Sequence, residues 1–528
     1  MKNALIMIFK LSPIAVLCAL VMSGFDTLVA APLSLFYAVL VCWAVTKRNV
    51  MDIIESAMTN VKNAIIIFFI FMMAYAVATL FMTTGVGASI IMAALKIGVS
   101  GRSIAVVAFL VTCILSMGTG TSWGTYAATI PIFIWTSHIV GGDPVLTMCA
   151  CAGGAAFGDN VALISDTTIM TCGIQEVEVI DRFRKQGFWS IFCVVAASIC
   201  FFVASCIMDL PTGAADVSNA LANIPQDAWT ALEAERPAAV ELLNQVSEGN
   251  IPLWMMLPIV IVIGLAILRV PTMICLGAGI VSAAIMGAFI GTMNSFSEFL
   301  GHIYDSFADA GSWIVVMVMW IIAFGGIMRE MDAFRPMAMF CIKASKKVRH
   351  LMFWNAILCI LGNMLLSDDQ AQMATMGPIT KDILEESVEG SEEDMYDLRC
   401  RNAMYGDAIG VLAGELIPWH VCNIYYVGLC GAVYPLMAFT AGDLIKFNFF
   451  AWISIASLLI LTLTGWDRFI PKFAIPSEPD VHLRKNIKLN EAVLEGAVEG
   501  YTEETAMKAA AVKTAKKSEA EADFKTKE

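Results

Sequence analysis

Long apolar stretches recur along most of the 528-residue chain, and charged residues interrupt them only rarely. A helix needs roughly 17–25 mostly apolar residues to cross a bilayer. The pattern therefore predicts an all-α polytopic membrane protein. The predicted membrane elements are residues 4–23, 28–46, 63–84, 104–140, 145–175, 187–208, 251–268, 272–292, 311–328, 350–387, 403–435 and 449–466.

Lysine and arginine residues between these elements predict the orientation, because cytoplasmic loops carry an excess of both. They mark cytoplasmic loops at 47–62, 182–185 and 329–349. If every element crossed the membrane, the second of these loops would lie on the wrong side. The conflict disappears if residues 104–140 enter from outside and turn back near Gly118–Ser122. The second half then has a matching hairpin at 350–387, which enters from inside and turns at residues 367–371.

The two halves then follow one plan, with about five spans and one re-entrant hairpin in each. Because they begin on opposite sides, we predict inverted repeats with broken helices at the midplane, a common plan for secondary transporters. A proline inside the linker, Pro237, is expected to break or kink any helix there. The predicted parts are a first repeat at 1–208, an extracytoplasmic linker at 209–250, a second repeat at 251–466 and a cytoplasmic charged tail at 467–528.

Composition supports a membrane protein and argues against other classes. Hydrophobic residues make up 58% of the chain and charged residues 15%, whereas about a quarter of a soluble protein is charged. The net charge of −13 gives no reason to expect nucleic acid as a partner. The 15 cysteines lie nearly all in apolar runs and form no CxxC pair, which is typical of small core residues.

The first polar cluster inside a membrane element lies at residues 157–168, where hydroxyl and amide side chains weaken the helix. A charge at mid-membrane costs at least about 2.5–3.5 kcal/mol unless it is paired, hydrated or neutralised. An unwound segment frees carbonyl oxygens, which can replace the water shell of sodium together with side-chain oxygens. A polar surface loop is the alternative, but apolar residues continue on both sides. The candidate ligands are Asp159, Asn160, Ser165, Asp166, Thr167 and Thr168, of which Asp159, Ser165 and Asp166 are the predicted sodium ligands.

The first hairpin tip adds the hydroxyls of Thr121 and Ser122. The surrounding Gly-Thr-Ser-Trp-Gly formally matches the GxSxG nucleophile elbow of hydrolases, but that motif needs a strand–turn–helix context. A membrane serine enzyme is therefore the weaker alternative here.

The second half supplies Asp368, Asp369 and Gln370 at its tip, and Glu415 and His420 on a span broken at Pro418. Adjacent carboxylates in a confined site hold protons more tightly, so a proton and a sodium ion can compete for one carboxylate. For Glu415 and His420, ion binding and structural hydrogen bonding are equally good interpretations. Arginine and lysine are nearly absent from these clusters, which favours a cation, although helix N-termini can bind a carboxylate substrate instead.

At these residues the sequence resembles the NhaC family of sodium/proton antiporters. The resemblance implies the ion-transporter superfamily fold, with inverted repeats, hairpin tips and often a homodimer. The family also resembles carriers of amino acids and of malate and lactate, and the sequence departs from its relatives at Asn160–Leu163, Glu415 and His420. The stretches that carry the resemblance are Gly120–Thr125, Phe157–Asp159 with Ile164–Thr168, Asp369–Gln370 and Leu416–Trp419.

We therefore expect a secondary active transporter, and not an enzyme, that exchanges sodium for protons by alternating access in the cytoplasmic membrane. The expected partners are the sodium ion, the proton and the lipid bilayer, with no cofactor beyond the transported ions. Both termini are expected in the cytoplasm. The alternative is a sodium- or proton-coupled carrier of a small organic solute, such as an amino acid or a dicarboxylate.

Overall fold

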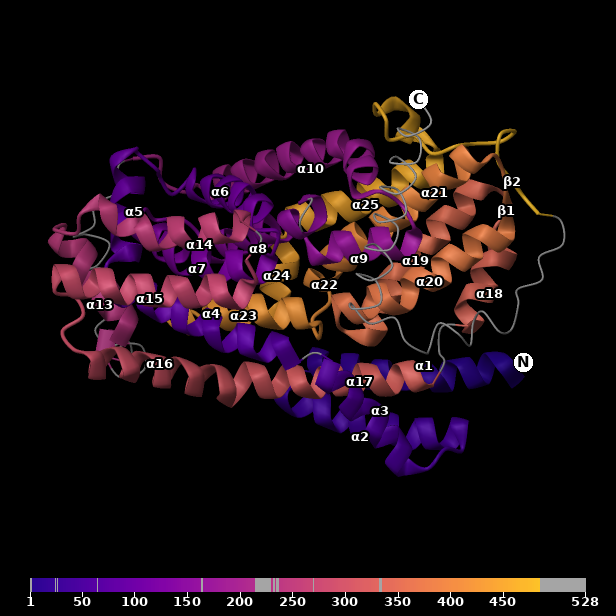
Figure 1. Cartoon of the computed structure of the whole chain (residues 1–528), viewed down its shortest axis with the longest axis horizontal. Coiled ribbons are helices and arrows are strands. Elements are labelled where there is room, and N and C mark those ends of the chain that lie inside the picture. Colours follow the sequence, from indigo (N-terminus) through magenta and orange to yellow (C-terminus); the bar gives the residue numbers. More distant parts are fainter. Residues whose placement is uncertain are drawn as a thin grey trace, which may run out of the picture.

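The structure is a computed structural model, and its described part is almost entirely helical (Figure 1). This confirms the predicted all-α class. Among the described residues, six helices are long and apolar enough to cross a membrane, and a seventh span results if Ala441–Phe447 and Phe449–Thr464, bent by 60°, are taken together. The described residues are 2–23, 25, 27–63, 65–162, 165–213, 229–230, 233, 237–268, 270–331 and 335–484.

The first half contains a helix pair, an amphipathic helix, a span, a short helix, a hairpin, a broken span and a long final helix. Their bounds are α1 (Lys2–Met22), α2 (Thr27–Thr46), α3 (Val50–Asn63), α4 (Ile65–Thr83), α5 (Val86–Lys96), α6 (Ile104–Thr119), α7 (Ser122–Ile139), α8 (Pro144–Val161), α9 (Asp166–Gln175) and α10 (Val179–Ile207).

The second half follows α13 (Pro237–Glu248), the described helix of the linker, and repeats this order. Its helices up to the end of the hairpin are η1 (Leu253–Met256), α14 (Leu257–Ile267), α15 (Thr272–Ile290), α16 (Phe296–Ala310), η2 (Gly311–Val315), α17 (Val316–Glu330), α18 (Arg335–Ala344), α19 (Val348–Leu366) and α20 (Asp369–Ser387). The remaining elements are β1 (Val388–Glu389), α21 (Glu392–Met404), η3 (Tyr405–Ile409), α22 (Gly410–Glu415), α23 (Val421–Val433), α24 (Ala441–Phe447), α25 (Phe449–Thr464), η4 (Trp466–Phe469) and β2 (His482–Leu483).

The two predicted hairpins are present and lie toward opposite ends of the molecule. Hairpin α6–α7 lies with α5 toward one end of the long axis, and hairpin α19–α20 lies with α21 and β1 toward the other (Figure 1). Each hairpin is followed by a broken span, α8–α9 in the first half and α21–η3–α22–α23 in the second. The symmetry that would relate the halves stays a prediction, but the order of elements agrees with it.

The two hairpins turn in the same way. Gly120 after α6 and Ser367 after α19 both have left-handed backbones, with φ of 68° and 58°. Glycine adopts this conformation freely, whereas serine does so only when its surroundings hold it there. The next residue is extended in both hairpins, Thr121 or Asp368, and the second arm begins directly after it. Ser122 and Asp369 therefore occupy equivalent places at the two tips.

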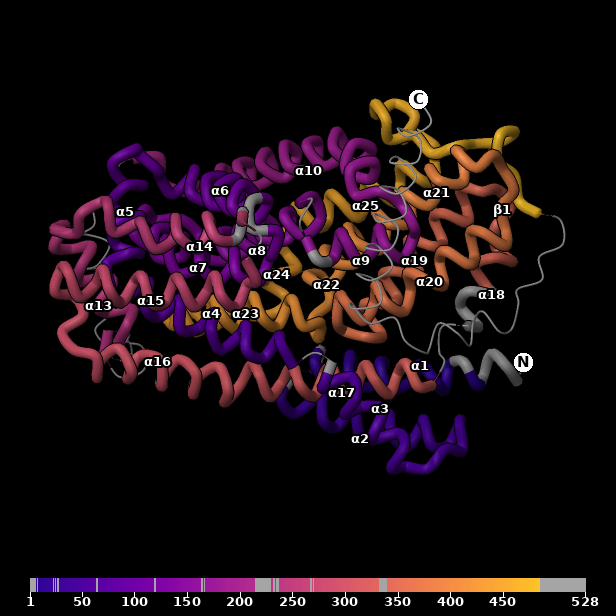
Figure 2. The backbone as a smooth tube through the Cα atoms, viewed as in Figure 1, coloured from indigo at the N-terminus to yellow at the C-terminus, as the bar shows by residue number. Residues whose placement is uncertain are grey.

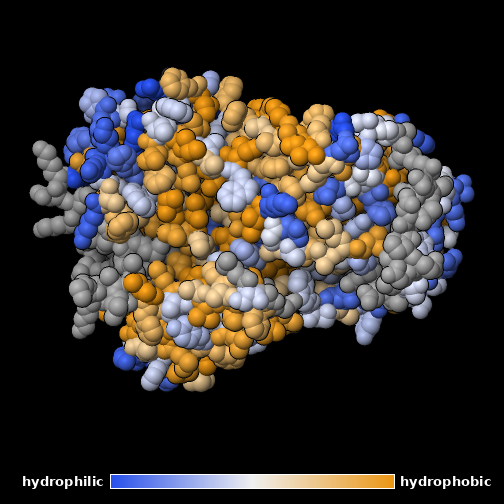
Figure 3. Space-filling view, turned by 180° about the vertical axis from the view of Figure 1, so that it is seen from behind, coloured by the Kyte–Doolittle hydropathy of each residue, from blue (hydrophilic) through white to orange (hydrophobic). Residues whose placement is uncertain are grey.

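The outer surface is apolar where lipid would contact it. Large exposed hydrophobic side chains follow one face of α10, including Phe188, Ile191, Val195 and Ile199. Helix α10 lies along one edge of the molecule, and α1, α2 and α3 lie along the opposite edge (Figure 2). Hydrophobic residues cover most of the middle of the molecule, and hydrophilic residues gather at both ends (Figure 3). This distribution is typical of a protein that spans a membrane.

Several boundaries differ from the sequence predictions. Helix α10 begins at Val179, earlier than the predicted 187, and the amphipathic helices α3 and α16 were not predicted. Helix α13 begins at Pro237, where the sequence predicted a break or kink, and residues 234–236 before it lie outside the described residues. Proline is favoured at that position, since its missing N–H would have no partner there and its φ suits the helix.

The first part of the predicted tail packs against the end of the molecule that carries α21. Leu483 and Val388 pair in the short sheet of β1 and β2. Phe473 stacks on Trp189 of α10, with ring centroids 5.7 Å apart, and Arg401 of α21 lies over the Phe473 ring. Residues 485–528 of the predicted tail lie outside the described residues.

Candidate functional site

The first hairpin tip is joined to the first broken span by a hydrogen bond from backbone to carboxylate. The Ser122 N–H, at the start of α7, donates to Asp159 Oδ1 over 2.9 Å. Asp159 is buried near the end of α8. A helix N-terminus carries partial positive charge, which stabilises a nearby carboxylate. This hydrogen bond therefore joins the first hairpin tip to the first break.

The break between α8 and α9 brings hydroxyl and carbonyl oxygens together. The backbone leaves the helix at Ala162, which is extended. The hydroxyls of Ser165 and Thr167 lie 2.8 Å apart, and both Thr167 and Thr168 donate to the Asp159 carbonyl, over 3.2 and 3.1 Å. The predicted unwound segment is therefore present. Asp166 begins α9, but its side chain lies outside the described residues.

The second tip and the second break meet in the same way. Asp369 Oδ1 lies 3.3 Å from His420 Nε2, and the Cys422 thiol donates to Asp369 Oδ2 over 2.9 Å. His420 is the N-cap of α23, where its Nδ1 accepts from the Cys422 N–H over 3.2 Å. Its Nε2 also lies 3.2 Å from Asn363 Oδ1, on the first arm of the hairpin.

The remaining predicted residues of the second half have different surroundings. Asp368 caps α20 by accepting from the Ala371 N–H over 2.7 Å. Glu415 ends α22, and its Oε2 accepts from Asn448 Nδ2 over 2.5 Å, while its buried Oε1 has no hydrogen-bond partner in the described structure. Gln370 is exposed, so the structure does not bring it into the buried group.

Three carboxylates from different elements form what we call the central carboxylate cluster: Asp159, Asp369 and Glu415. Asp369 interacts electrostatically with both of the others, and Glu415 with Asp159. All three are buried. The Ser122 side chain also hydrogen-bonds with Tyr426 of α23, which links the first tip to the second broken span. The cluster therefore draws on both halves of the chain.

Buried negative charge exceeds buried positive charge. Among the described side chains, the buried carboxylates are Asp159, Asp368, Asp369, Asp407, Glu415 and Asp467, and the buried arginines are Arg182 and Arg401. The two arginines are paired with Asp407, at 2.7 Å, and with Asp467, at 3.4 Å. The other four carboxylates lie at the second tip and in the central carboxylate cluster. Arg329 interacts electrostatically with Asp368 but is only partly buried.

Arg182 corrects two expectations: that residues 182–185 form a cytoplasmic loop, and that arginine is nearly absent from the polar clusters. It lies in α10 and is 1% exposed. Besides pairing with Asp407, it donates to the Asn160 carbonyl and to the Thr168 hydroxyl, each over 3.0 Å. Asn160 also accepts from Gln186 over 2.7 Å. We call these contacts the Arg182 network. They hold Asn160 and Thr168 on the side of the break that faces α10.

The second arm of each hairpin packs against the broken span of the other half. Along α7 and α23, the Tyr126 hydroxyl donates to the Tyr426 carbonyl over 2.8 Å and Trp135 Nε1 donates to the Val433 carbonyl over 3.1 Å. Along α20 and α9, Gln175 Nε2 donates to the Gly377 carbonyl over 2.8 Å. Each half therefore supplies a hairpin arm that supports the other half.

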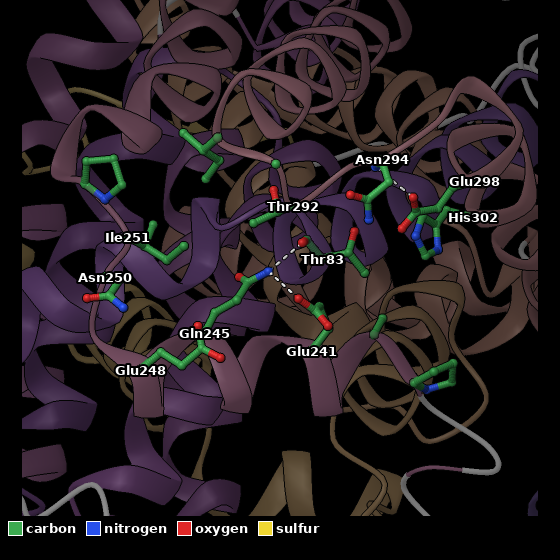
Figure 4. A pocket seen from close by; sticks show the side chains of 15 residues that line it. Thr83, Glu241, Gln245, Glu248, Asn250, Ile251, Thr292, Asn294, Glu298 and His302 are labelled. Carbon is green, nitrogen blue, oxygen red and sulfur yellow. Dashed lines mark hydrogen bonds between the residues drawn. The ribbon is translucent and has the colours of Figure 1, made fainter.

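A separate cavity of about 470 Å³ lies beside α13 (Figure 4), which is at the end of the molecule opposite α21 (Figure 1). Gln245 of α13 donates to the Thr83 carbonyl and to Glu241 there, over 2.6 and 3.0 Å. Glu241, Glu248 and Glu298 line it, and no lysine or arginine does among the residues that the structure describes. Acid-lined hollows attract cations.

The comparisons with known proteins point to one kind of transporter. A sequence model of the Na+/H+ antiporter family matches residues 3–206 and 154–466. The chain is 24% identical over 382 residues to the malate-2H(+)/Na(+)-lactate antiporter of Bacillus subtilis, which covers 69% of this chain and 74% of that protein. It is 24% identical over 419 residues to the Na(+)/H(+) antiporter NhaC of Alkalihalophilus pseudofirmus, with 76% and 82% covered.

Two further proteins widen this comparison. The arginine/ornithine antiporter ArcD of Halobacterium salinarum is 22% identical over 381 residues, which cover 69% of this chain and 71% of that protein. Among solved structures, the YdaH transporter of Alcanivorax borkumensis matches with a TM-score of 0.37 and 14% identity, over 79% of this chain and 89% of that one.

Proposed function

This chain belongs to the Na+/H+ antiporter family, and from that premise we propose that it exchanges sodium ions for protons across the cell membrane by alternating access. The resemblance expected from the sequence is thereby confirmed, and membership of an antiporter family agrees with a transporter rather than an enzyme. The organic substrates named for two relatives make the choice of solute a separate question.

The surplus of buried carboxylates is the observation that carries the proposal. Each uncompensated charge at mid-membrane costs at least about 2.5–3.5 kcal/mol, so such groups bind protons or cations. Asp159, Asp369 and Glu415 interact with one another, and both buried arginines among the described residues are already paired elsewhere. A site of this kind is neutral when it holds protons or when it holds sodium, which is the condition for their exchange.

The first break provides the better sodium ligands. Asp159, Ser165 and Thr167 offer carboxylate, hydroxyl and carbonyl oxygens close together. Sodium prefers such hard oxygen donors, and unwound carbonyls take the place of its water shell. We assign proton binding chiefly to Asp369 and Glu415, which lie across the cluster. Asp166 remains the predicted third sodium ligand.

The experiment is sodium-driven proton movement in everted membrane vesicles, followed with a pH-sensitive dye. Sodium should dissipate an imposed pH gradient through the wild-type protein, and Asp159→Asn, Asp166→Asn and Asp369→Asn should each abolish the signal. Asp209→Asn is the matched control, because the Asp209 side chain is 96% exposed and pairs with the partly exposed Arg102 at 3.3 Å. Normal sodium-driven exchange by the Asp369→Asn variant would remove that residue from the mechanism.

One structural feature supports a second candidate, a coupled carrier of a small organic anion. The N-termini of α7, α9, α20 and α23 all begin at the tips and breaks. Helix N-termini favour bound carboxylates. Proteoliposomes assayed with a panel of cations, amino acids and dicarboxylates would separate the candidates, because a pH signal that needs the organic solute would favour this second one.

We also propose that the protein lies in the cell membrane with both termini in the cytoplasm, because cytoplasmic loops are rich in lysine and arginine and the segments 47–62 and 329–349 carry many of these residues. The homodimer implied by the resemblance stays a prediction.

A further inference from the structure

Three side chains at the second tip and the second break combine a carboxylate, an imidazole and a thiol. These are Asp369, His420 and Cys422, all buried, with ligand atoms within 4.8 Å of one another. In the part of the chain that the structure describes, they are the one group of three His, Cys, Asp or Glu residues placed to hold a single metal ion. This set differs from the all-oxygen groups at the first break.

The donor set selects the kind of metal. Thiolate and imidazole suit zinc and other transition metals, whereas sodium, magnesium and calcium prefer oxygen. Zinc sites with three protein ligands leave a fourth position for water, with bonds of about 2.0–2.3 Å. The three ligand atoms lie at most 4.8 Å from one another, so small movements of the side chains would bring all three to one ion.

We propose that Asp369, His420 and Cys422 form a binding site for a thiophilic divalent metal such as Zn²⁺ or Cd²⁺, and that the bound metal arrests transport. The binding is independent of the proposed function, whereas the arrest rests on it. Asp369 Oδ1 is buried and makes no hydrogen bond in the described structure, and its 3.3 Å contact with His420 Nε2 is a contact between two of the proposed ligand atoms.

Metal binding changes the protonation of two of the three ligands. Without metal, the Cys422 thiol donates to Asp369, and the ring proton of His420 sits on Nε2 because Nδ1 accepts from the Cys422 N–H. Metal binding releases the thiol proton to solvent and moves the ring proton to Nδ1, which breaks the 3.2 Å cap hydrogen bond. The ionised carboxylate and thiolate then neutralise the divalent ion.

Arrest follows from where the ligands lie. Asp369 is at the tip that begins α20, and His420 and Cys422 are at the start of α23. A metal would tie the hairpin tip to the broken span and occupy a carboxylate of the central cluster. Exchange needs both the movement and the carboxylate.

The test uses Co²⁺ as a probe on the purified full-length protein in detergent, with no ion gradient. Wild-type protein should show a thiolate-to-cobalt charge-transfer band that Zn²⁺ and Cd²⁺ abolish and Mg²⁺ does not. Cys422→Ser should lose the band and weaken Cd²⁺ binding about tenfold or more. Cys430→Ser is the matched control, because Cys430 is a buried cysteine of the same helix outside the group, and it should keep the band.

A second variant shows whether a loss of metal binding comes from the lost ligand or from misfolding. His420→Asn should weaken Cd²⁺ binding by a similar factor while its gel-filtration profile stays monodisperse. A wild-type protein without the band, or a band that survives Cys422→Ser, would overturn the site. If the band behaves as expected but Cd²⁺ leaves sodium-driven exchange unchanged, the arrest is wrong and the site stands. If the protein shows no sodium-driven exchange at all, the proposed function fails while the cobalt result still decides the metal site.

Discussion

Arg182 stabilises the first break through three different partners. Its guanidinium pairs with Asp407 at 2.7 Å and donates to the Asn160 carbonyl and to the Thr168 hydroxyl. Removing one partner of a buried ion pair leaves the other charge uncompensated and costs about 3–5 kcal/mol. We therefore expect Arg182→Met to lower the free energy of unfolding by about that amount and to abolish exchange. Thermal unfolding of the detergent-solubilised protein measures the first effect.

Two further variants control this prediction. Arg184→Met removes an arginine of the same helix that is 65% exposed and 3.8 Å from Asp181, and such surface pairs contribute only about 0–1 kcal/mol. Arg182→Met combined with Asp407→Asn should recover part of the stability, because the buried carboxylate is then neutral. An Arg182→Met protein as stable as wild type would contradict the assigned role.

The role of Arg182 was hidden in the sequence by its neighbours. Arg184 and Lys185 make the segment resemble a cytoplasmic loop, and burial depends on contacts with distant residues such as Asp407. A local signal existed nevertheless, because Arg182, Gln186 and Trp189 follow the helical spacing of the buried face of α10. Asp159, Asp369 and Glu415 were easier to identify, since an acidic residue inside an apolar segment needs no partner to be noticed.

At the scale of elements, helices α6 and α8 pack at backbone contact. A Cβ at Gly154 would lie 2.8 Å from the Phe109 carbonyl, and one at Gly158 would collide with Ser116. The Ser116 hydroxyl also donates to the Ala155 carbonyl. Gly158→Ala should force the helices apart, cost about 1–3 kcal/mol or more, and displace the adjacent Asp159 from the Ser122 N–H. Stability and sodium-driven exchange should fall together.

Gly187→Ala tests whether this effect comes from packing. Gly187 lies inside α10, where an added Cβ would meet nothing within 4 Å. Alanine is the better helix former, so this variant should be as stable as wild type or slightly more stable. Equal losses for the two variants would mean that the α6–α8 contact is unimportant.

The elements themselves were predictable to different degrees. The first hairpin was inferred from the basic residues at 182–185, which the structure places in α10, and the second by its match to the first. The broken spans were inferred from polar residues inside apolar runs. Helices α3 and α16, of 14 and 15 residues, carry charged residues and are amphipathic. They have no long apolar run, so only their contacts with neighbouring spans reveal their place. Helix α14 is shorter than the span predicted at 251–268, with 11 residues.

At the scale of the whole molecule, paired lysine side chains lie at one end and an acid-lined cavity lies at the other. Lys185 pairs with Asp397 of α21 and Lys347 with Glu478 of the packed tail, at the end that carries β1 (Figure 1). The opposite end carries the acid-lined cavity beside α13 (Figure 4). Because basic residues stay in the cytoplasm, the β1 end should face inward and the cavity outward.

Cysteine labelling tests this orientation. Glu393 in α21 and Thr212 after α10 are both exposed. Thr212 lies near the start of α6, because the Arg102 N–H donates a hydrogen bond to the carbonyl of the neighbouring Pro211. Both variants carry Cys206→Ser as background, which removes the exposed cysteine among the described residues. A membrane-impermeant maleimide should then label Glu393→Cys only in everted vesicles and Thr212→Cys only in right-side-out vesicles. Labelling of both from one side would mean that the two ends do not lie across the bilayer, and the alternating-access proposal would fail with it. The reverse pattern would instead keep the spans and invert the direction of exchange.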